Sequence, residues 1–329
     1  MIKSMLRILA VVATAGLVST SVLGQTQVDP NLPSYKPVQG VSGSINSVGS
    51  DTMNNMMALW TEKFKEYYPD VTVSIEGKGS GTAPPALIEG TSNFGPMSRA
   101  IKETEIDKFE EAFGYEPTEL RTAIDMLAVY VHKDNPIADR GLTLPEVDAI
   151  FSKTRNLGYA NDVRRWGQVG LTGAYRFAPI SVYGRNSASG TYGYFKGNAM
   201  GKGDFKDTVN EQPGSSAVVQ SVASDRYGIG YSGIGYKTAD VKVVPLAAEN
   251  GGDFIPAEGK YAYSGEYPLA RFLYLSVNYR PGSEMEPLRR EFIKFIFSKE
   301  GQEIVLKDGY LPVSNEIAKE ELDRLGISR

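Results

Sequence analysis

The apolar residues along this chain follow two spacings. At 53–67 they recur every three or four positions, which is the period of a helix with one buried face. At 71–75 they alternate with polar residues, which is typical of a half-buried strand. Further strands are predicted at 42–49, 120–132, 179–183 and 271–278, and further helices at 86–90, 143–151, 189–195 and 284–298. This succession of strands and helices predicts an α/β fold with mostly parallel sheets and helices on both faces.

Residues 1–24 have the pattern of a secretory signal peptide. Lys3 and Arg7 precede an uncharged, mainly apolar stretch, and small residues near Gly24 predict cleavage after that position. An uncleaved membrane anchor is the alternative, but the stretch is shorter than the roughly 20 residues that span a bilayer. The mature protein is therefore expected to be periplasmic or secreted. Residues 25–40 contain three prolines and no periodicity, which predicts a flexible leader.

The composition excludes several kinds of chemistry. The chain has 329 residues, no cysteine and one histidine. Without cysteine there is no disulfide, thiol nucleophile or iron–sulfur cluster. The histidine, His132, ends an apolar stretch, where a structural hydrogen bond explains it better than a catalytic base does. The 35 basic and 39 acidic residues give a net charge of −4, which argues against a nucleic-acid partner. No metal site and no cofactor is predicted.

Glycine and hydroxyl residues gather at four turns that lead from predicted strands into helices. These turns are Gly49-Ser50-Asp51-Thr52, Gly79-Ser80-Gly81-Thr82, Pro96-Met97-Ser98-Arg99 and Ser189-Gly190-Thr191. In open α/β sheets, ligands bind beyond the carboxyl ends of the strands, where such turns leave backbone N–H groups unpaired. Those amides, the neighbouring hydroxyls and the helix dipole together suit an oxyanion. Arg185 and Arg99 lie near enough in sequence to add permanent charge.

Each of these features has an ordinary structural explanation when it is taken alone. A hydroxyl residue before a helix is commonly an N-cap. An isolated arginine commonly belongs to a surface ion pair. The repetition of the pattern at four turns, two of them with a nearby arginine, favours an anion-binding cleft without identifying the anion.

The turns, together with other segments, resemble a known family. In chain order the segments are GSDTM at 49–53, GKGSGTAPPAL at 77–87, PMSR at 96–99, LTLPEVDAIFS at 142–152, WG at 166–167, GRNSASGTYGYF at 184–195 and EYPLARFLYLSVN at 266–278. Their order is similar to that in the phosphate-binding proteins of ABC phosphate importers, the PstS type. The resemblance implies a periplasmic type II solute-binding fold with two α/β lobes and the ligand between them. The first lobe would contain residues 41–127 and 258–329, and the second lobe residues 128–257.

The resemblance also implies which residues bind the ligand. They are Ser50, Asp51, Thr52, Met53, Ser80, Gly81, Thr82, Ser98, Arg99, Arg185, Ser189, Gly190 and Thr191. Thr52, Ser80 and Ser189 would donate their hydroxyls. Arg185 would be the charged donor, and Met53 would contribute its backbone N–H, as would the two residues after Ser189.

Two positions depart from the family pattern. Ser98 stands where members of the family often have an aspartate, which accepts the proton of hydrogen phosphate. Ser187 stands where an acidic residue often orients the arginine. Our hypothesis is that Asp51 replaces the missing proton acceptor. Arg99 would add charge to the site or balance Asp51.

The sequence therefore predicts a monomeric protein that binds inorganic phosphate outside the cytoplasm and delivers it to an ABC transporter permease in the inner membrane. Another tetrahedral oxyanion (sulfate, molybdate or tungstate) is the alternative ligand, because Ser98 is not acidic. A secreted hydrolase of phosphate esters is a third class of function. It is not favoured, because the sequence has neither a metal-ligand cluster nor a histidine–nucleophile pair.

Overall fold

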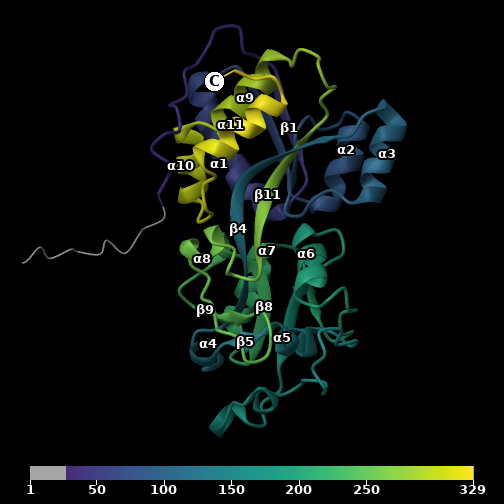
Figure 1. The fold of residues 1–329 in the computed structure, drawn as a ribbon, viewed down its shortest axis with the longest axis vertical. Helices are drawn as coiled ribbons and strands as arrows, with labels where there is room; N and C mark the ends of the chain where they lie inside the picture. The colour runs from purple at the N-terminus through teal and green to yellow at the C-terminus, as the bar shows by residue number, and fades with distance from the viewer. Residues whose placement is uncertain (1–26, 329) are drawn as a thin grey trace, which may run out of the picture.

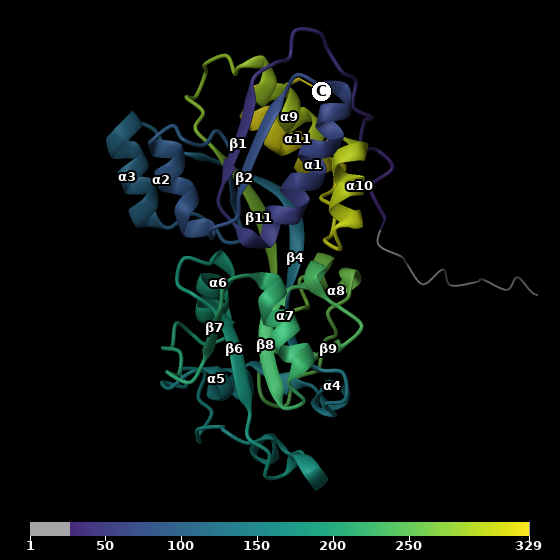
Figure 2. The same ribbon diagram turned by 180° about the vertical axis from the view of Figure 1, so that it is seen from behind.

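The structure is a computed structural model that describes residues 27–328. Within this range, no helix has both the length and the apolar character needed to cross a membrane. The predicted signal peptide and its cleavage site lie outside the described residues. Two lobes follow one another along the long axis of the molecule, and the strands β4 (Thr118–His132) and β11 (Ala270–Val277) run between them (Figure 1, Figure 2).

Both lobes contain strands and helices in the alternation that the sequence predicts. The other strands are β1 (Ser44–Val48), β2 (Thr72–Glu76), β3 (Gly95–Met97), β5 (Leu142–Thr143), β6 (Ser181–Arg185), β7 (Asn210–Gln212), β8 (Gly228–Gly233), β9 (Val241–Val243) and β10 (Leu246–Ala247). The helices are α1 (Asn54–Tyr67), α2 (Ala83–Ile88), α3 (Glu103–Phe113), α4 (Ile137–Arg140), α5 (Leu144–Phe151), α6 (Gly190–Asn198), α7 (Ser215–Ser224), α8 (Gly259–Tyr263), α9 (Pro287–Ile296), α10 (Lys299–Lys307) and α11 (Asn315–Arg324). Helix α9 begins three residues later than predicted, at a proline, which is favoured in the first helical turn.

One mixed sheet passes through both lobes, with the strand order β3-β11-β4-β8-β6-β7 and with β9 paired to β4. Strand β4 pairs antiparallel with β11 over 118–126 and with β8 over 127–131, so it belongs to each lobe in turn. Strand β6 pairs in parallel with β7 and β8. The predicted α/β class is confirmed. The sheet is mixed rather than mostly parallel, because the two strands that cross between the lobes run in opposite directions.

Each lobe has its own hydrophobic core. Residues between 32 and 123 and between 273 and 327 build the first core. Residues between 126 and 269 build most of the second. Tyr267 and Leu269 are buried in the second core, although the sequence analysis assigned everything after residue 257 to the first lobe. We propose that the second lobe extends to the start of β11.

The segment 27–40 has no helix or strand, but it is held against the first lobe. Leu32 and Tyr35 are buried in the first core. The Tyr35 hydroxyl lies 2.6 Å from the Tyr68 hydroxyl and donates to Glu291 Oε2 at 3.1 Å. We therefore propose that this segment belongs to the first lobe and is not a flexible leader. The burial of Leu32 and Tyr35 could not be predicted from the segment itself, because it has no periodicity and the partners of these side chains lie far away in sequence.

We expect Tyr35→Phe to lower the free energy of unfolding by about 1–2 kcal/mol, because a buried hydroxyl loses two partners and Glu291 loses a donor. Urea unfolding followed by circular dichroism measures this. Tyr67→Phe is the matched control. The Tyr67 ring lies 5.3 Å from that of Tyr35, and no hydrogen bond of its hydroxyl is found within residues 27–328. Equal midpoints for the two variants would contradict the docking of the segment.

Candidate anion-binding site

Four loops meet where the two lobes face each other. Three follow β1, β2 and β3 in the first lobe, and the fourth joins β6 to α6 in the second lobe. They bring together six hydroxyl residues that are each at most 3% exposed: Ser50, Thr52, Ser80, Ser98, Ser189 and Thr191. The first loop is anchored by α1, whose Trp60 is fully buried and donates its Nε1–H to the carbonyl of Gly301 at 2.8 Å. Six of the seven predicted hydroxyl residues, all but Thr82, therefore gather in one place.

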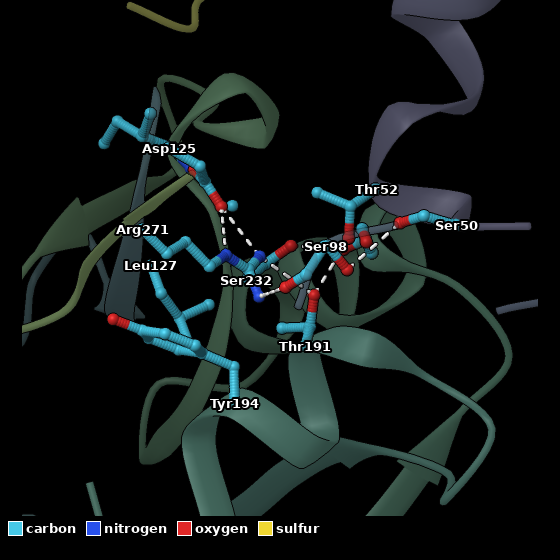
Figure 3. Close-up of polar contacts among 12 residues, drawn as sticks. Ser50, Thr52, Ser98, Asp125, Leu127, Thr191, Tyr194, Ser232 and Arg271 are labelled. Atoms are coloured by element: carbon cyan, nitrogen blue, oxygen red, sulfur yellow. Dashed lines mark hydrogen bonds and ion pairs between the residues drawn. The ribbon is translucent and has the colours of Figure 1, made fainter. Parts of the chain in front are cut away.

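Hydrogen bonds connect these hydroxyls within and between the lobes. Ser50 Oγ donates to Ser98 Oγ at 3.0 Å, and the Ser98 N–H donates to Ser80 Oγ at 3.0 Å. Thr52 Oγ1 of the first lobe lies 2.8 Å from Thr191 Oγ1 of the second (Figure 3). We call these five residues the hydroxyl cluster. Because each hydroxyl has one proton and two lone pairs, the cluster can turn donors toward an oxyanion.

Glycine is required where the loops of the two lobes touch. A Cβ atom at Gly190 would lie 2.2 Å from Ser80 Oγ and 2.6 Å from Ser98 Oγ. Ser189 caps α6 by accepting the N–H of Tyr192. The N–H groups of the first helical residues have no acceptor within the helix, so this terminus also presents donors toward the cluster.

Arg185 and Asp51 form an ion pair between the lobes. Arg185 is 3% exposed, and its Nη1 donates to Asp51 Oδ2 at 3.0 Å and to Ser215 Oγ at 2.8 Å. Asp51 Oδ2 also accepts the N–H of Ser215 at 2.8 Å. The Nε of Arg185 is buried and has no hydrogen-bond partner among the described residues. Asp51 therefore orients the arginine from the opposite lobe, while Nε remains available as a donor.

The guanidinium of Arg99 is directed to a different partner. Its Nη1 and Nη2 donate to the two carboxylate oxygens of Glu105 at 2.8 and 2.6 Å. Burial alone would raise the pKa of Glu105, but the hydrogen bonds and charge of Arg99 lower that pKa overall. The structure does not bring the guanidinium of Arg99 to the hydroxyl cluster.

Three other predicted residues use their polar groups to shape the turns. The N–H of Met53 donates to the Ser50 carbonyl at 3.2 Å, and the Met53 side chain lies in the first core. Thr82 Oγ1 donates to the Gly79 carbonyl at 2.8 Å. The N–H of Gly81 donates across the lobes to the carbonyl of Ala188 at 3.0 Å.

The donors that converge here are hydroxyl, amide and guanidinium groups. Within residues 27–328, no group of three or more histidine, aspartate and glutamate side chains is arranged to hold a metal ion. The arrangement is chemically suited to binding an oxyanion through hydrogen bonds, some of them assisted by the arginine charge.

Comparison with known proteins shows the family to which this chain belongs. A family model described as a PBP superfamily domain matches residues 34–300. The chain is 53% identical over 300 residues to the phosphate-binding protein PstS of Pseudomonas aeruginosa, which covers 91% of this chain and 92% of that protein. The chain belongs to the PstS family. A second member, from Staphylococcus saprophyticus, is 28% identical over 263 residues, covering 79% of this chain and 77% of that one.

Solved structures of PstS-like proteins share the fold. A protein of Clostridium perfringens, assigned as a phosphate ABC transporter substrate-binding protein and solved with bound phosphate, matches with a TM-score of 0.69 and 26% identity. The match covers 82% of this chain and 99% of that one. An ABC-type phosphate transport receptor of Vibrio cholerae, 22% identical with a TM-score of 0.62, has the same fold over 82% of this chain and all of its own. The predicted family and two-lobed fold are confirmed.

The sequence analysis of this PstS-family protein missed a second buried arginine. Arg271 on β11 donates to the Ser98 carbonyl at 2.7 Å and to Thr191 Oγ1 at 3.0 Å, and it pairs with Asp125 on β4. The available signal was a charged residue in each of two predicted strands, Asp125 in 120–132 and Arg271 at the start of 271–278. Since charged residues are rarely buried unless they are paired, the two could have been matched with each other.

Proposed function

We propose that this PstS-family protein binds inorganic phosphate between its lobes, outside the cytoplasm, and delivers it to an ABC transporter permease. The observation that carries the proposal is the buried Nε of Arg185, which lacks a hydrogen-bond partner within residues 27–328. Arg185 ends β6, directly before the loop that leads to Ser189 and Thr191. Relatives in Pseudomonas and Staphylococcus are named phosphate-binding proteins, and the Clostridium perfringens protein holds phosphate, which supports the proposal.

Phosphate would favour the closed arrangement of the lobes. Asp51 with Arg185, and Thr52 with Thr191, already join the first lobe to the second. An oxyanion that accepts hydrogen bonds from both sides of the cleft would bind the closed form better than an open one, and would shift the population accordingly. Delivery to the permease would then require the lobes to separate.

We also propose that the protein catalyses no reaction, acts as a monomer and is exported by a signal peptide cleaved near Gly24. The named relatives are substrate-binding proteins of transport systems, which supports the first point. A phosphatase assay with and without divalent metal tests for catalysis. Light scattering tests the monomer, and the mass of the exported protein tests the cleavage site.

The choice of phosphate over sulfate, molybdate or tungstate requires a hydrogen-bond acceptor. At neutral pH phosphate carries a proton and sulfate does not, so an acceptor separates the two anions. Oδ2 of Asp51 is occupied by Arg185 and Ser215. We propose that Oδ1 of Asp51 accepts the phosphate proton. The names of the relatives do not favour the other oxyanions.

We expect the wild-type protein to prefer phosphate to sulfate by about 10⁴-fold, as a site that reads one ligand hydrogen bond does. Asp51→Asn should reduce this preference at least about tenfold, because an amide no longer repels the proton-free anion. Isothermal titration with both anions measures the ratio. The ratio of the phosphate and sulfate affinities is compared, and not either affinity alone, because both affinities fall when Arg185 is oriented less well.

Asp253→Asn, at an exposed aspartate, is the control and should leave the ratio unchanged. Equal binding of both anions by the wild type would overturn the phosphate proposal. If Asp51→Asn keeps the wild-type preference for phosphate over sulfate, only the role of Asp51 as proton acceptor is overturned.

A further inference from the structure

A buried ion pair lies on the two strands that join the lobes. Arg271 of β11 stands opposite Asp125 of β4, and their side chains are 2% and 0% exposed. Arg271 Nε and Nη2 donate to Asp125 Oδ2 at 2.9 and 2.7 Å, and Oδ1 accepts the N–H of Ile234 at 3.0 Å. A buried ion pair adds little to stability unless the rest of its hydrogen bonds are satisfied. The other contacts of Arg271 therefore matter.

The guanidinium of Arg271 reaches a loop of each lobe. Nη1 donates to the Ser98 carbonyl of the first lobe at 2.7 Å, and Nη2 donates to Thr191 Oγ1 of the second at 3.0 Å. The Arg271 Cζ lies 5.2 Å from the centre of the Tyr194 ring, whose face attracts a cation. Figure 3 shows Arg271 between Asp125 and these two loops. One side chain between the crossing strands thus contacts both sides of the cleft.

The contact with Thr191 determines what that hydroxyl can offer. Since Nη2 of Arg271 donates to Oγ1, the single hydroxyl proton of Thr191 points away from Arg271. It is then directed toward Thr52 Oγ1, 2.8 Å away, or toward a bound anion. The positive charge behind the oxygen also strengthens this hydroxyl as a donor, because hydrogen bonds in a chain polarise one another.

We infer that Arg271, held by Asp125 on the crossing strands, is a positioning residue for the anion: it keeps Thr191 as a hydrogen-bond donor. The inference rests on the proposed phosphate function. Arg271 acts through Thr191 rather than by touching the ligand. Arg271 also couples Thr191 to closure of the lobes, because its guanidinium contacts Ser98 and Thr191 together only when the two loops meet.

The test is titration of the exported protein with inorganic phosphate after the paired change Asp125→Asn/Arg271→Gln. Removing both charges together leaves no buried charge unpaired, so the unfolding midpoint should stay close to that of the wild type. We expect the Kd for phosphate to rise roughly 10–100-fold, the range for one charge-assisted hydrogen bond. The matched control is Arg140→Gln/Glu146→Gln, which removes a two-bond ion pair in the second lobe and should leave the Kd unchanged.

Thr191→Val distinguishes this role from a purely structural one, because an ion pair that only stabilised the fold would not change how Thr191→Val affects the Kd for phosphate. If Arg271 acts through Thr191, adding Thr191→Val to the paired change raises the Kd no further than the larger of the two separate effects. Effects that multiply, or an unchanged Kd after the paired change, overturn the inference and leave the phosphate proposal intact. Failure of the wild type to bind phosphate overturns both.

Arg271→Lys is the second variant if the paired change prevents folding. It keeps the charge but loses the planar fork that reaches Asp125, Ser98 and Thr191 together. We expect the Kd to rise in the same direction by a smaller factor. A wild-type Kd for this variant overturns the inference equally.

Discussion

Arg185→Ala is expected to weaken phosphate binding by about a thousandfold, which corresponds to roughly 4 kcal/mol. Arg185 is 3% exposed, and its buried Nε has no hydrogen-bond partner among the described residues. Truncation removes the permanent charge at the end of β6 and leaves the Asp51 carboxylate, among residues 27–328, with only the N–H of Ser215 as a hydrogen-bond donor. A desolvated anion would therefore lose its charged donor and face a carboxylate whose charge is no longer balanced by the arginine. Isothermal titration in phosphate-free buffer measures the change.

Two further variants separate the charge of Arg185 from its geometry. Arg185→Lys keeps the charge but loses the fork, so its affinity should fall between those of the wild type and Arg185→Ala. Arg165→Ala removes an exposed arginine of the same lobe and should have no effect. A wild-type affinity in Arg185→Ala would mean that the anion binds outside this cleft.

The turns of the site could be predicted because their information is local. Gly-hydroxyl sequences at the ends of strands specify helix caps and free amides within a few residues. Ser50, Thr52, Ser80, Ser98 and Thr191 accordingly gather as expected, from segments that the hydrophobic spacing had already separated into strands and helices.

The pairing of charges across the fold could not be predicted in the same way. Asp51 and Arg185 are 134 residues apart, and Asp125 and Arg271 are 146 apart, so only the packed tertiary structure decides that they meet. The redirection of Arg99 is a different case, because its partner Glu105 lies six residues further on. That pairing could have been considered from the sequence, and it holds the guanidinium away from the cluster even though Arg99 directly follows Ser98.

Gly190→Ala is expected to reduce the affinity for phosphate at least about 100-fold, or roughly 3 kcal/mol, while leaving the ligand-free fold intact. The added Cβ would lie 2.2 Å from Ser80 Oγ. It would also lie 2.8 Å from Ser80 Cβ, a clash that no rotation of the hydroxyl relieves. The lobes must then stay apart, and an anion receives donors from one side of the cleft only. Titration gives the affinity, and small-angle scattering shows whether phosphate still compacts the protein.

Gly197→Ala is the matched control for this prediction, because it introduces the same substitution in the same helix. A Cβ atom at Gly197 meets no atom within 4 Å, so this variant should bind phosphate as the wild type does. Both substitutions place alanine in α6 without a positive φ angle, so each removes the conformational cost of a helical glycine. Any loss of binding peculiar to Gly190→Ala therefore reports on contact between the lobes and not on the stability of α6. Wild-type affinity and compaction in Gly190→Ala would show that phosphate binds without the loop contact seen here.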